Sequence, residues 1–407
     1  MVATVDVAIV GGGMVGASLA MALAGSGLSL ALIEGVAPGA NSQPSFDERT
    51  TALGNGTQAM LQTLGLWQSV AALAAPIREI HVTDAGRFGM ARLKADEQGI
   101  DAFGHVITNR VLGAALWAAL ATQPSLRRFM PARAQWLGAD PGFATLAIQP
   151  AAANSETVEL RARLVVAADG ADSAVRSALG LGVQTVDYQQ VAVIANVATS
   201  DPHRGVAHER FTPAGPIALL PLFDGARGLI WTLAPAAAAR VLALTEEEFL
   251  RDLQKAFGWR AGRFERVGKR ASYALRLQRA DETLAPRCLL IGNAAQVLHP
   301  IAGQGFNLGM RDAALLAELL LRHRADAGAP TLLAEYDLAR ADDRAGITRF
   351  TDGLIKLFGD ERPAAGLARS VGLLAFDLLP PAKAAMSRLS WGWDGKRPKL
   401  TRGVPLI

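Results

Sequence analysis

Hydrophobic positions near the N-terminus predict a strand, a glycine-rich turn, a helix and a second strand. Residues 5–10 form a short apolar run rich in valine, interrupted only by Asp6. Three consecutive glycines follow at 11–13, then an apolar segment to about residue 25, and a second apolar run at 28–33. Short, nearly continuous apolar runs are typical of strands buried in a parallel sheet. The opening of the chain therefore predicts a βαβ unit.

The same buried-strand pattern recurs twice far downstream. Apolar runs cover 164–168 and 288–291, whereas residues 184–233 form alternating segments punctuated by turn residues. Alternation of that kind predicts a mostly antiparallel sheet. We therefore predict an α/β fold in which a discontinuous parallel-sheet domain contains an inserted, mostly antiparallel sheet domain and is followed by a helical region. The predicted boundaries are 1–75, 101–180 and 281–345 for the discontinuous domain, 76–100 and 181–280 for the inserted domain, and 346–407 for the C-terminal region.

Apolar residues at helical spacing predict the main helices. Thr245 and Glu248 form a capping box that predicts the start of a helix reaching to about residue 257. The C-terminal pattern is helical from about residue 337 to 379, where two consecutive prolines are expected to end it. Further helices are predicted at 57–64, 111–121 and 305–323.

Composition narrows the class of protein. Of the 407 residues, 50% are hydrophobic and 19% are charged, which excludes a disordered or collagen-like chain. The single cysteine, Cys288, cannot form an internal disulfide, a redox pair or a zinc cluster, and it indicates a reducing, cytoplasmic compartment. Residues 7–33 carry no charge and could span a bilayer by length, but the glycine triplet interrupts them and no basic segment precedes them. We interpret this run as a buried strand and helix.

The surplus of positive charge is concentrated at the C-terminus. The formal net charge is +4, and residues 383–407 contain six Lys and Arg against Asp394 alone, so the rest of the chain is nearly neutral. The arginines elsewhere are scattered, so no nucleic-acid footprint is predicted. The basic tail contains Trp391 and Trp393 and follows an apolar stretch at 371–379. It could make peripheral contact with an anionic inner membrane, or it could be an ordinary packed or solvated terminus.

The glycine turn carries the first candidate site, a G-x-G-x-x-G motif at Gly11, Gly13 and Gly16. Gly11 permits the tight turn, Gly13 lets a pyrophosphate approach the backbone, and Gly16 allows the helix to pack closely on the strand. Glu34, after the second strand, is placed to hold ribose hydroxyls. The pattern predicts a dinucleotide site, with a purely structural turn as the alternative. It does not by itself choose between NAD and FAD.

Two later motifs indicate FAD by resemblance. Asp169-Gly170 with Ser173 and Arg176 matches a DGxxSxxR fingerprint, and residues 292–309 supply a second glycine-rich pattern. On these residues the chain resembles, over nearly its whole length, the FAD-dependent aromatic hydroxylases of the p-hydroxybenzoate hydroxylase type. The resemblance implies a Rossmann-like FAD-binding domain with an inserted substrate domain. It also implies FAD contacts for Asp169, Gly170, Asn293, Pro300, Gly303, Gln304, Gly305 and Asn307, and for Arg49 and Arg110, whose alternative is an ordinary surface ion pair.

Residues 292–309 resemble one branch more specifically, the ubiquinone-biosynthesis hydroxylases, and within it the 2-octaprenyl-6-methoxyphenol hydroxylases. Segments 47–54, 64–67 and 372–381 look like the same branch. Asn293 departs from the wider family, in which most members have Asp at this position. Its amide can still form hydrogen bonds with a ribityl hydroxyl, but it carries no charge.

The stretch before the helix predicted at 305–323 is suited to a flavin ring. The helix N-terminus presents free N–H groups and a partial positive charge, which would stabilise a reduced, anionic flavin. Gly303 and Gly305 keep side chains away from the ring. His299 could assist in deprotonating a substrate phenol, or it could be a structural group that hydrogen-bonds the turn.

The resemblance implies an NAD(P)H- and O2-dependent monooxygenase that hydroxylates a polyprenylated phenol. NAD(P)H would reduce FAD, O2 would add to it as a C4a-hydroperoxide, and the phenol would attack the distal oxygen. Alternatives are hydroxylation at another ring carbon, a water-soluble aromatic substrate, or a flavin-bound scaffold subunit of a quinone-synthesis complex. The lone cysteine disfavours disulfide reductases, and the WxWxIP signature of halogenases is absent because Asp-Gly follows Trp393. No metal site is predicted.

Overall fold

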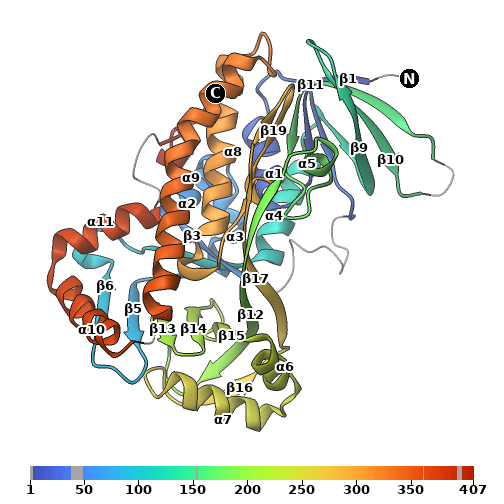
Figure 1. Cartoon of the computed structure of the whole chain (residues 1–407). Coiled ribbons are helices and arrows are strands. Elements are labelled where there is room, and N and C mark those ends of the chain that lie inside the picture. The colour runs from blue at the N-terminus through green and yellow to red at the C-terminus, as the bar shows by residue number, and fades with distance from the viewer. Residues whose placement is uncertain (1–2, 38–48, 153–154, 361, 392–396) are drawn as a thin grey trace.

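Strands that are far apart in the sequence lie side by side in an eight-stranded sheet (Figure 1). The computed structural model describes residues 3–37, 49–152, 155–360, 362–391 and 397–407. β1 (Ala3–Val10) pairs in parallel with β2 (Leu30–Ile33) and with β11 (Val158–Ala167), and β11 pairs in parallel with β19 (Cys288–Leu290). This arrangement confirms the predicted α/β fold built on a discontinuous parallel sheet. The sheet is completed by β8 (Leu126–Phe129), β9 (Ala132–Ala139), β10 (Ala144–Pro150) and β18 (Leu284–Ala285).

The larger hydrophobic core lies between this sheet and a layer of helices. Val7 and Ile9 of β1 are fully buried there, because both faces of a parallel sheet are covered. The helices on this side pack on one another, with α1 in contact with both α4 and α8. They are α1 (Met14–Ala22), α2 (Asn55–Thr63), α3 (Trp67–Val70), α4 (Asn109–Ala121) and α8 (Gln304–Arg322). α5 (Ala174–Ala178) lies near β9 on the other side.

A nine-stranded sheet forms the second layer of the molecule. Most of its neighbouring strands are antiparallel, as predicted, but β5 pairs in parallel with β13. This pair joins segments more than a hundred residues apart, and a parallel pair needs such a long connection. The strands are β5 (Glu79–Asp84), β6 (Met90–Lys94), β12 (Val183–Thr199), β13 (Val206–Thr212), β14 (Gly215–Pro221), β15 (Arg227–Leu233), β16 (Phe264–Val267), β17 (Ala271–Ala280) and β20 (Gln296–Val297). The domain boundaries proposed from the sequence stay a prediction, and β20 of this sheet comes from the segment 281–345 that was assigned to the other domain.

Two helices cover one face of the nine-stranded sheet (Figure 1). They are α6 (Pro235–Ala243) and α7 (Glu246–Phe257), and the predicted capping box between Thr245 and Glu248 begins α7. Phe249 and Leu253 of α7 are fully buried against the sheet. The opposite face is therefore the one that can border a ligand site.

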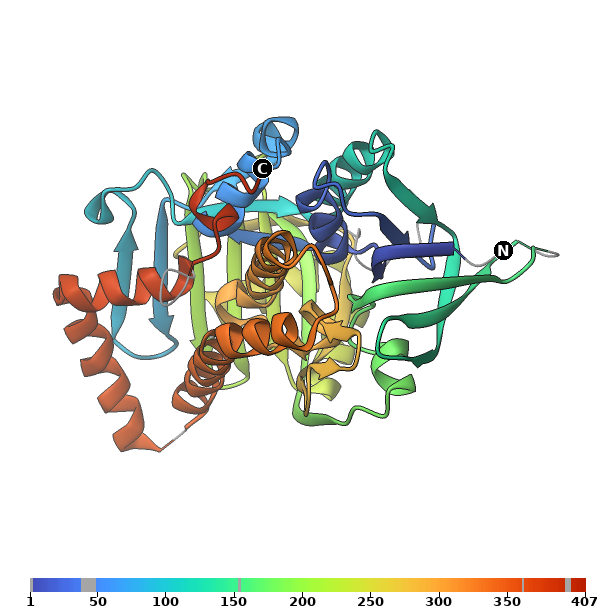
Figure 2. The same cartoon turned by 90° about the horizontal axis from the view of Figure 1, so that it is seen from above.

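The C-terminal helices differ from the prediction. The expected helix from 337 to 379 is two helices, α9 (Pro330–Gly359) and α10 (Pro363–Leu378). Pro380 does not end the helical region but begins α11 (Pro380–Trp391). Proline is compatible with a first helical turn because its missing N–H would have no partner there. Figure 2 shows α10 and α11 projecting at the side of the molecule where β5 and β6 lie.

A small sheet and several single turns complete the fold. A three-stranded sheet contains β3 (Thr50–Gly54), β4 (Ala75–Pro76) and β7 (Gly104–Thr108). Single 3₁₀ turns are η1 (Ala71–Leu73), η2 (Asp96–Gln98), η3 (Gly292–Ala294), η4 (Ile301–Gly303) and η5 (Leu400–Arg402). Within the described part of the chain, every helix is too short or too polar to cross a bilayer.

Candidate active site

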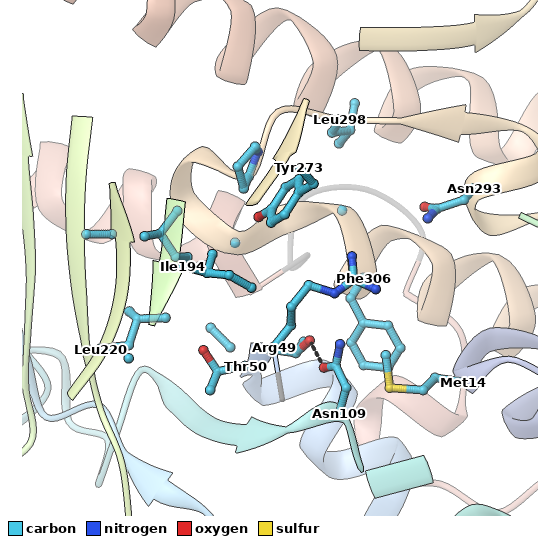
Figure 3. Close-up of a pocket in the computed structure, with 18 of the residues that line it drawn as sticks. Met14, Arg49, Thr50, Asn109, Ile194, Leu220, Tyr273, Asn293, Leu298 and Phe306 are labelled. Atoms are coloured by element: carbon cyan, nitrogen blue, oxygen red, sulfur yellow. Dashed lines mark hydrogen bonds between the residues drawn. The ribbon is translucent and has the colours of Figure 1, made fainter. Parts of the chain in front are cut away.

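A cavity of about 1410 Å³ lies between the glycine-rich turns of the first sheet and the uncovered face of the second (Figure 3). Pockets for one small ligand usually measure about 300–1,000 Å³, so this cavity has room for a dinucleotide and a substrate together. Residues from three separate motifs, and the two arginines predicted to contact FAD, meet in its lining. They are Gly13, Arg49, Arg110, Gly170, Asn293, Pro300, Gly303 and Gly305.

The first glycine turn requires residues without a Cβ. Gly11 has φ +103°, and a Cβ there would lie 2.3 Å from the carbonyl oxygen of Ala168. A Cβ on Gly16 would lie 2.0 Å from the carbonyl oxygen of Gly11. Gly13 is the N-cap of α1, and no side chain among the described residues caps that helix. The turn therefore leaves backbone N–H groups for a phosphate at the helix N-terminus.

Glu34 is held by the same turn. One of its carboxylate oxygens accepts a hydrogen bond from the Gly12 N–H at 2.6 Å, and the other accepts from the Val36 N–H at 2.9 Å. These bonds fix the carboxylate beside the glycine turn, although Glu34 is not among the residues lining the cavity. Its contact with ribose hydroxyls stays a prediction.

An arginine of the DGxxSxxR fingerprint joins this motif to the glycine-rich pattern at 292–309. The buried Arg176 guanidinium donates to the carbonyl oxygens of Ala294 at 2.9 Å and Ala171 at 2.7 Å. Asp169 Oδ2 accepts from the Val175 N–H at 3.2 Å, whereas Asp169 Oδ1 is buried and has no hydrogen-bond partner among the described residues. Asp169 is not among the residues lining the cavity, so its contact with FAD stays a prediction.

A buried ionic network holds the turn that carries Asn293. Asp312 of α8 accepts from the Gly292 N–H at 3.1 Å and from Arg340 Nε of α9 at 2.8 Å. Asp343 pairs with both Arg340 and Arg311. Burial opposes the charged form of Asp343, but the two guanidinium groups hold the pKa of its carboxyl below the usual range. The network fixes α8, α9 and the Gly292 turn together, and Asn293 itself is exposed toward the cavity.

Asn307 clamps the helix start rather than facing the cavity. Its Oδ1 accepts from the Gly54 N–H and the Thr57 hydroxyl, at 2.8 and 2.7 Å. Its Nδ2 donates to the carbonyl oxygens of Ala52 and Gly303, at 2.9 and 3.0 Å. These four bonds commit the side-chain amide to the protein, and the FAD contact expected for Asn307 stays a prediction. The buried Gln304 also lies outside the cavity lining.

His299 is suited to donating a hydrogen bond rather than to accepting a proton. Its Nδ1 accepts from the Ile301 N–H at 3.2 Å, which places the proton of the neutral ring on Nε2. Burial lowers the pKa of His299 to about 4, and the Tyr188 ring packs edge-on against it at 5.3 Å. These contacts favour the structural alternative for His299 over the role in phenol deprotonation.

The sequence did not single out several residues that line the cavity. Thr51 donates to Asn109 Oδ1 at 2.6 Å and joins β3 to α4 (Figure 3). The Arg49 guanidinium lies 5.7 Å from the centre of the Tyr273 ring, an aromatic to which no role was assigned. The nine-stranded sheet adds a mainly apolar wall that includes the acid Glu209. None of these positions belongs to a glycine-rich motif, so pattern alone gave no signal for them.

Comparison with known proteins gives consistent matches over almost the whole chain. Residues 4–351 match the family model described as FAD binding domain. The chain is 39% identical to ubiquinone hydroxylase UbiL of Rhodospirillum rubrum, over 98% of this chain and 93% of that protein. It is 32% identical to the 3-demethoxyubiquinol 3-hydroxylase of Escherichia coli, over 91% of this chain and 94% of that protein.

Solved structures have the same fold at lower sequence identity. The p-nitrophenol 4-monooxygenase PnpA of Pseudomonas putida superimposes with a TM-score of 0.80 and 21% identity, over 97% of this chain and 100% of that one. The anhydrotetracycline hydroxylase OxyS of Streptomyces rimosus gives a TM-score of 0.73 and 23% identity, over 97% of this chain and 77% of that one. These likenesses show the fold alone.

Proposed function

Since this chain belongs to the FAD-binding domain family, we propose that it is an FAD-dependent monooxygenase that hydroxylates the ring of a polyprenylated phenol in ubiquinone biosynthesis. The observation that carries the proposal is the large cavity, which is bordered by the glycine-rich motifs on one side and by a mainly apolar sheet face on the other. The names of two relatives, a ubiquinone hydroxylase and a 3-demethoxyubiquinol 3-hydroxylase, support the substrate class.

Residues of the eight-stranded sheet and the helices packed on it would hold the cofactor. The α1 N-terminus at Gly13 would receive the pyrophosphate, and Asn293 offers a polar side chain to the ribityl hydroxyls. The α8 N-terminus, whose N-cap Gly303 has φ +61°, would direct its partial positive charge at the flavin ring. Bound FAD would supply the transfer of one oxygen atom from O2 to the ring, with electrons from NAD(P)H.

Residues of the second layer would hold the substrate. Ile194, Leu220 and Ile230 present apolar side chains to the cavity, and small residues between them leave space beside the sheet. An apolar wall suits a prenylated ring and excludes water from the reacting atoms. The protein thus needs to position and desolvate the phenol more than to supply many reactive groups.

Deletion of the gene in its own organism tests the pathway. We expect ubiquinone to be lost and a less hydroxylated prenylated precursor to accumulate, identified by mass spectrometry. Accumulation of the 6-methoxyphenol precursor would support the finer assignment made from the sequence, and another precursor would move the reaction to a different ring carbon. Normal ubiquinone would contradict the pathway. If the reintroduced protein restores the wild-type level of ubiquinone and binds FAD but never consumes NAD(P)H, it is a scaffold instead.

We propose a peripheral lipid contact made by the basic tail together with α10, which contains the apolar stretch before it. Arg388, Arg397, Lys399 and Arg402 of the tail are exposed, whereas one other cation is not. Lys383 is buried and lies 3.3 Å from Asp377 and 3.4 Å from Glu97, so it is not available to lipid headgroups. The segment around the buried Leu400 packs against α2 and α8. Trp393 and Lys396 lie outside the described residues, as does the side chain of Trp391.

The apolar stripe of α10 supports this placement. Leu367, Val371, Leu374 and Leu378 recur at helical spacing and are 40–78% exposed. The other side of α10 is fixed to the sheet, because buried Arg369 donates to Asp84 of β5 at 3.0 Å. A helix with one anchored side and one exposed apolar side is suited to lie on a bilayer surface, where a membrane-dissolved prenyl substrate would be found.

Charged substitutions in the stripe should weaken vesicle binding. We expect the double variant V371E/L378E to bind phosphatidylcholine–phosphatidylglycerol vesicles at least about tenfold more weakly in a sedimentation assay, because two apolar contacts are lost and two acids are repelled. L137E, which changes a 54% exposed leucine on β9, is the matched control and should bind like the wild type. Equal binding of all three proteins would refute the lipid contact.

A further inference from the structure

A row of side chains across the nine-stranded sheet faces the cavity and contains a single carboxylate. Glu209 of β13 is opposite Ala218 of β14, which is opposite Ile230 of β15, and Ile230 is opposite Ile194 of β12. All four residues line the cavity. Residues directly opposite one another on antiparallel strands project to the same face of the sheet. Glu209 is therefore the one acid in this row, and its neighbours in the row are apolar.

The Glu209 carboxylate has no partner within the described part of the chain. Two acids that are buried elsewhere have partners: Asp84 pairs with Arg369, and Asp312 pairs with Arg340. No hydrogen bond or ion pair of this kind involves the Glu209 side chain, which is half-buried with its accessible part toward ligand space. The Glu209 oxygens are not among the fully buried polar atoms, so a ligand in the cavity can contact them.

Glu209 also lies next to the turn predicted to run under the flavin ring. A smaller cavity of about 20 Å³ is lined by Glu209 together with His299 and Pro300. Glu209 thus borders both the substrate wall and the cofactor turn. His299 cannot take its place as a base, because its Nδ1 already accepts from Ile301 and its Nε2 carries the proton.

Burial alone raises the pKa of Glu209 to about 7. The charged and titratable groups around it do not reverse that effect. His299, which lines the smaller cavity together with Glu209, is kept neutral because burial lowers its pKa to about 4. The remaining ionisable residues lining the larger cavity are Arg49, Arg110, Asp172, His208, Lys269, Tyr273 and Arg276, and burial is the only cause of the Glu209 shift. A base is most effective when its pKa lies near the working pH.

We propose that Glu209 is the catalytic base that accepts the hydroxyl proton of the phenolic substrate. In this step the phenol O–H bond breaks, its electron pair stays on the phenol oxygen, and the proton moves to a Glu209 carboxylate oxygen. No group is oxidised or reduced. The resulting phenolate has a more electron-rich ring, as oxygen transfer to that ring requires. The inference rests on the proposed function, since it needs a phenol in the cavity.

The variant Glu209→Gln removes the base while keeping the size of the side chain. We expect its turnover in product formation to fall about 100-fold or more, with FAD stoichiometry and thermal unfolding unchanged. Wild-type turnover should rise with pH through an apparent pKa near 7, because only the deprotonated carboxylate accepts the proton, and the variant should lose this rise. Glu209→Asp should restore part of the rate and the pH dependence. Glu265→Gln, at a surface ion pair with Arg263, is the matched control.

A measurement on the bound substrate separates a base from a merely structural residue. A prenylated phenol labelled with ¹³C at its hydroxyl-bearing carbon, bound to the FAD-loaded protein without O2, should show the phenolate shift in the wild type and the phenol shift in Glu209→Gln. If the bound substrate has the same ionisation state in the wild type and in Glu209→Gln, Glu209 is not the base. The same holds if Glu209→Gln still hydroxylates the phenol with an unchanged pH profile. Either result leaves the proposed function standing. A wild type that hydroxylates no prenylated phenol would refute the proposed function itself.

Discussion

Replacing Gly11 with alanine is expected to weaken FAD binding by about 30–100-fold, which corresponds to about 2–3 kcal/mol. The φ of +103° at Gly11 is unfavourable for a residue with a Cβ, and that Cβ would lie 2.3 Å from the Ala168 carbonyl oxygen. Relief of this clash would separate the glycine turn from the end of β11. The N–H groups of the turn would then no longer be placed for the pyrophosphate.

Fluorescence titration of the FAD-free protein with FAD measures this effect. Gly27→Ala is the matched control, because Gly27 has a comparable φ of +83° but a Cβ there would meet no atom within 4 Å. The control shares the backbone strain without disturbing the turn and should bind FAD like the wild type. If both variants bound FAD equally well, the glycine turn would not be the pyrophosphate site.

Replacing Arg340 with methionine is expected to lower the free energy of unfolding by about 3–5 kcal/mol. Arg340 is fully enclosed between Asp312 and Asp343, and its loss leaves buried acids with fewer partners. Burial opposes its charge, but the two carboxylates together raise the pKa of the Arg340 guanidinium above its usual value. Because Asp312 also holds the Gly292 N–H, the variant should in addition retain less FAD.

Urea unfolding at several pH values tests this prediction. The pKa of Asp343 is held low in the folded protein, so its stabilising contribution is present above the ordinary carboxyl pKa and is lost as pH falls through the folded value. The variant should therefore lose less stability on acidification than the wild type. Lys356→Met, which removes a partner from the exposed Lys356–Asp352 pair, should change stability by under about 1 kcal/mol. A similarly small effect at Arg340 would contradict the account of the network.

The sequence predicted the first sheet better than the second. β1, β11 and β19 are strands covered on both faces, and their continuous apolar runs are visible in any window of the chain. The placement of β5 beside β13 depends on a pairing between distant segments, and local periodicity does not record it. Pro380 was misjudged because the same residue can follow one helix and begin another.

The sequence predicted best those residues of the candidate site that act through their backbone. Glycine turns fix the chain path, so Gly13, Gly303 and Gly305 were placed at the cavity from sequence alone. Side-chain contacts were harder to predict, since the amide of Asn307 is used entirely within the protein. Glu209 follows His208 and precedes Arg210, and three polar residues in succession are also typical of an exposed strand. Only the register of β13 with β14 shows that Glu209 faces the cavity.

We expect this protein to insert an oxygen atom from O2 into a prenylated phenol. The most direct measurement incubates the FAD-loaded protein with NAD(P)H, a short-chain prenylated 6-methoxyphenol and ¹⁸O2, followed by mass spectrometry of the products. We expect a ring-hydroxylated product that carries one ¹⁸O atom and forms only when NAD(P)H is present. NAD(P)H consumption that yields only hydrogen peroxide, or a hydroxylated product whose added oxygen comes from water, would contradict it.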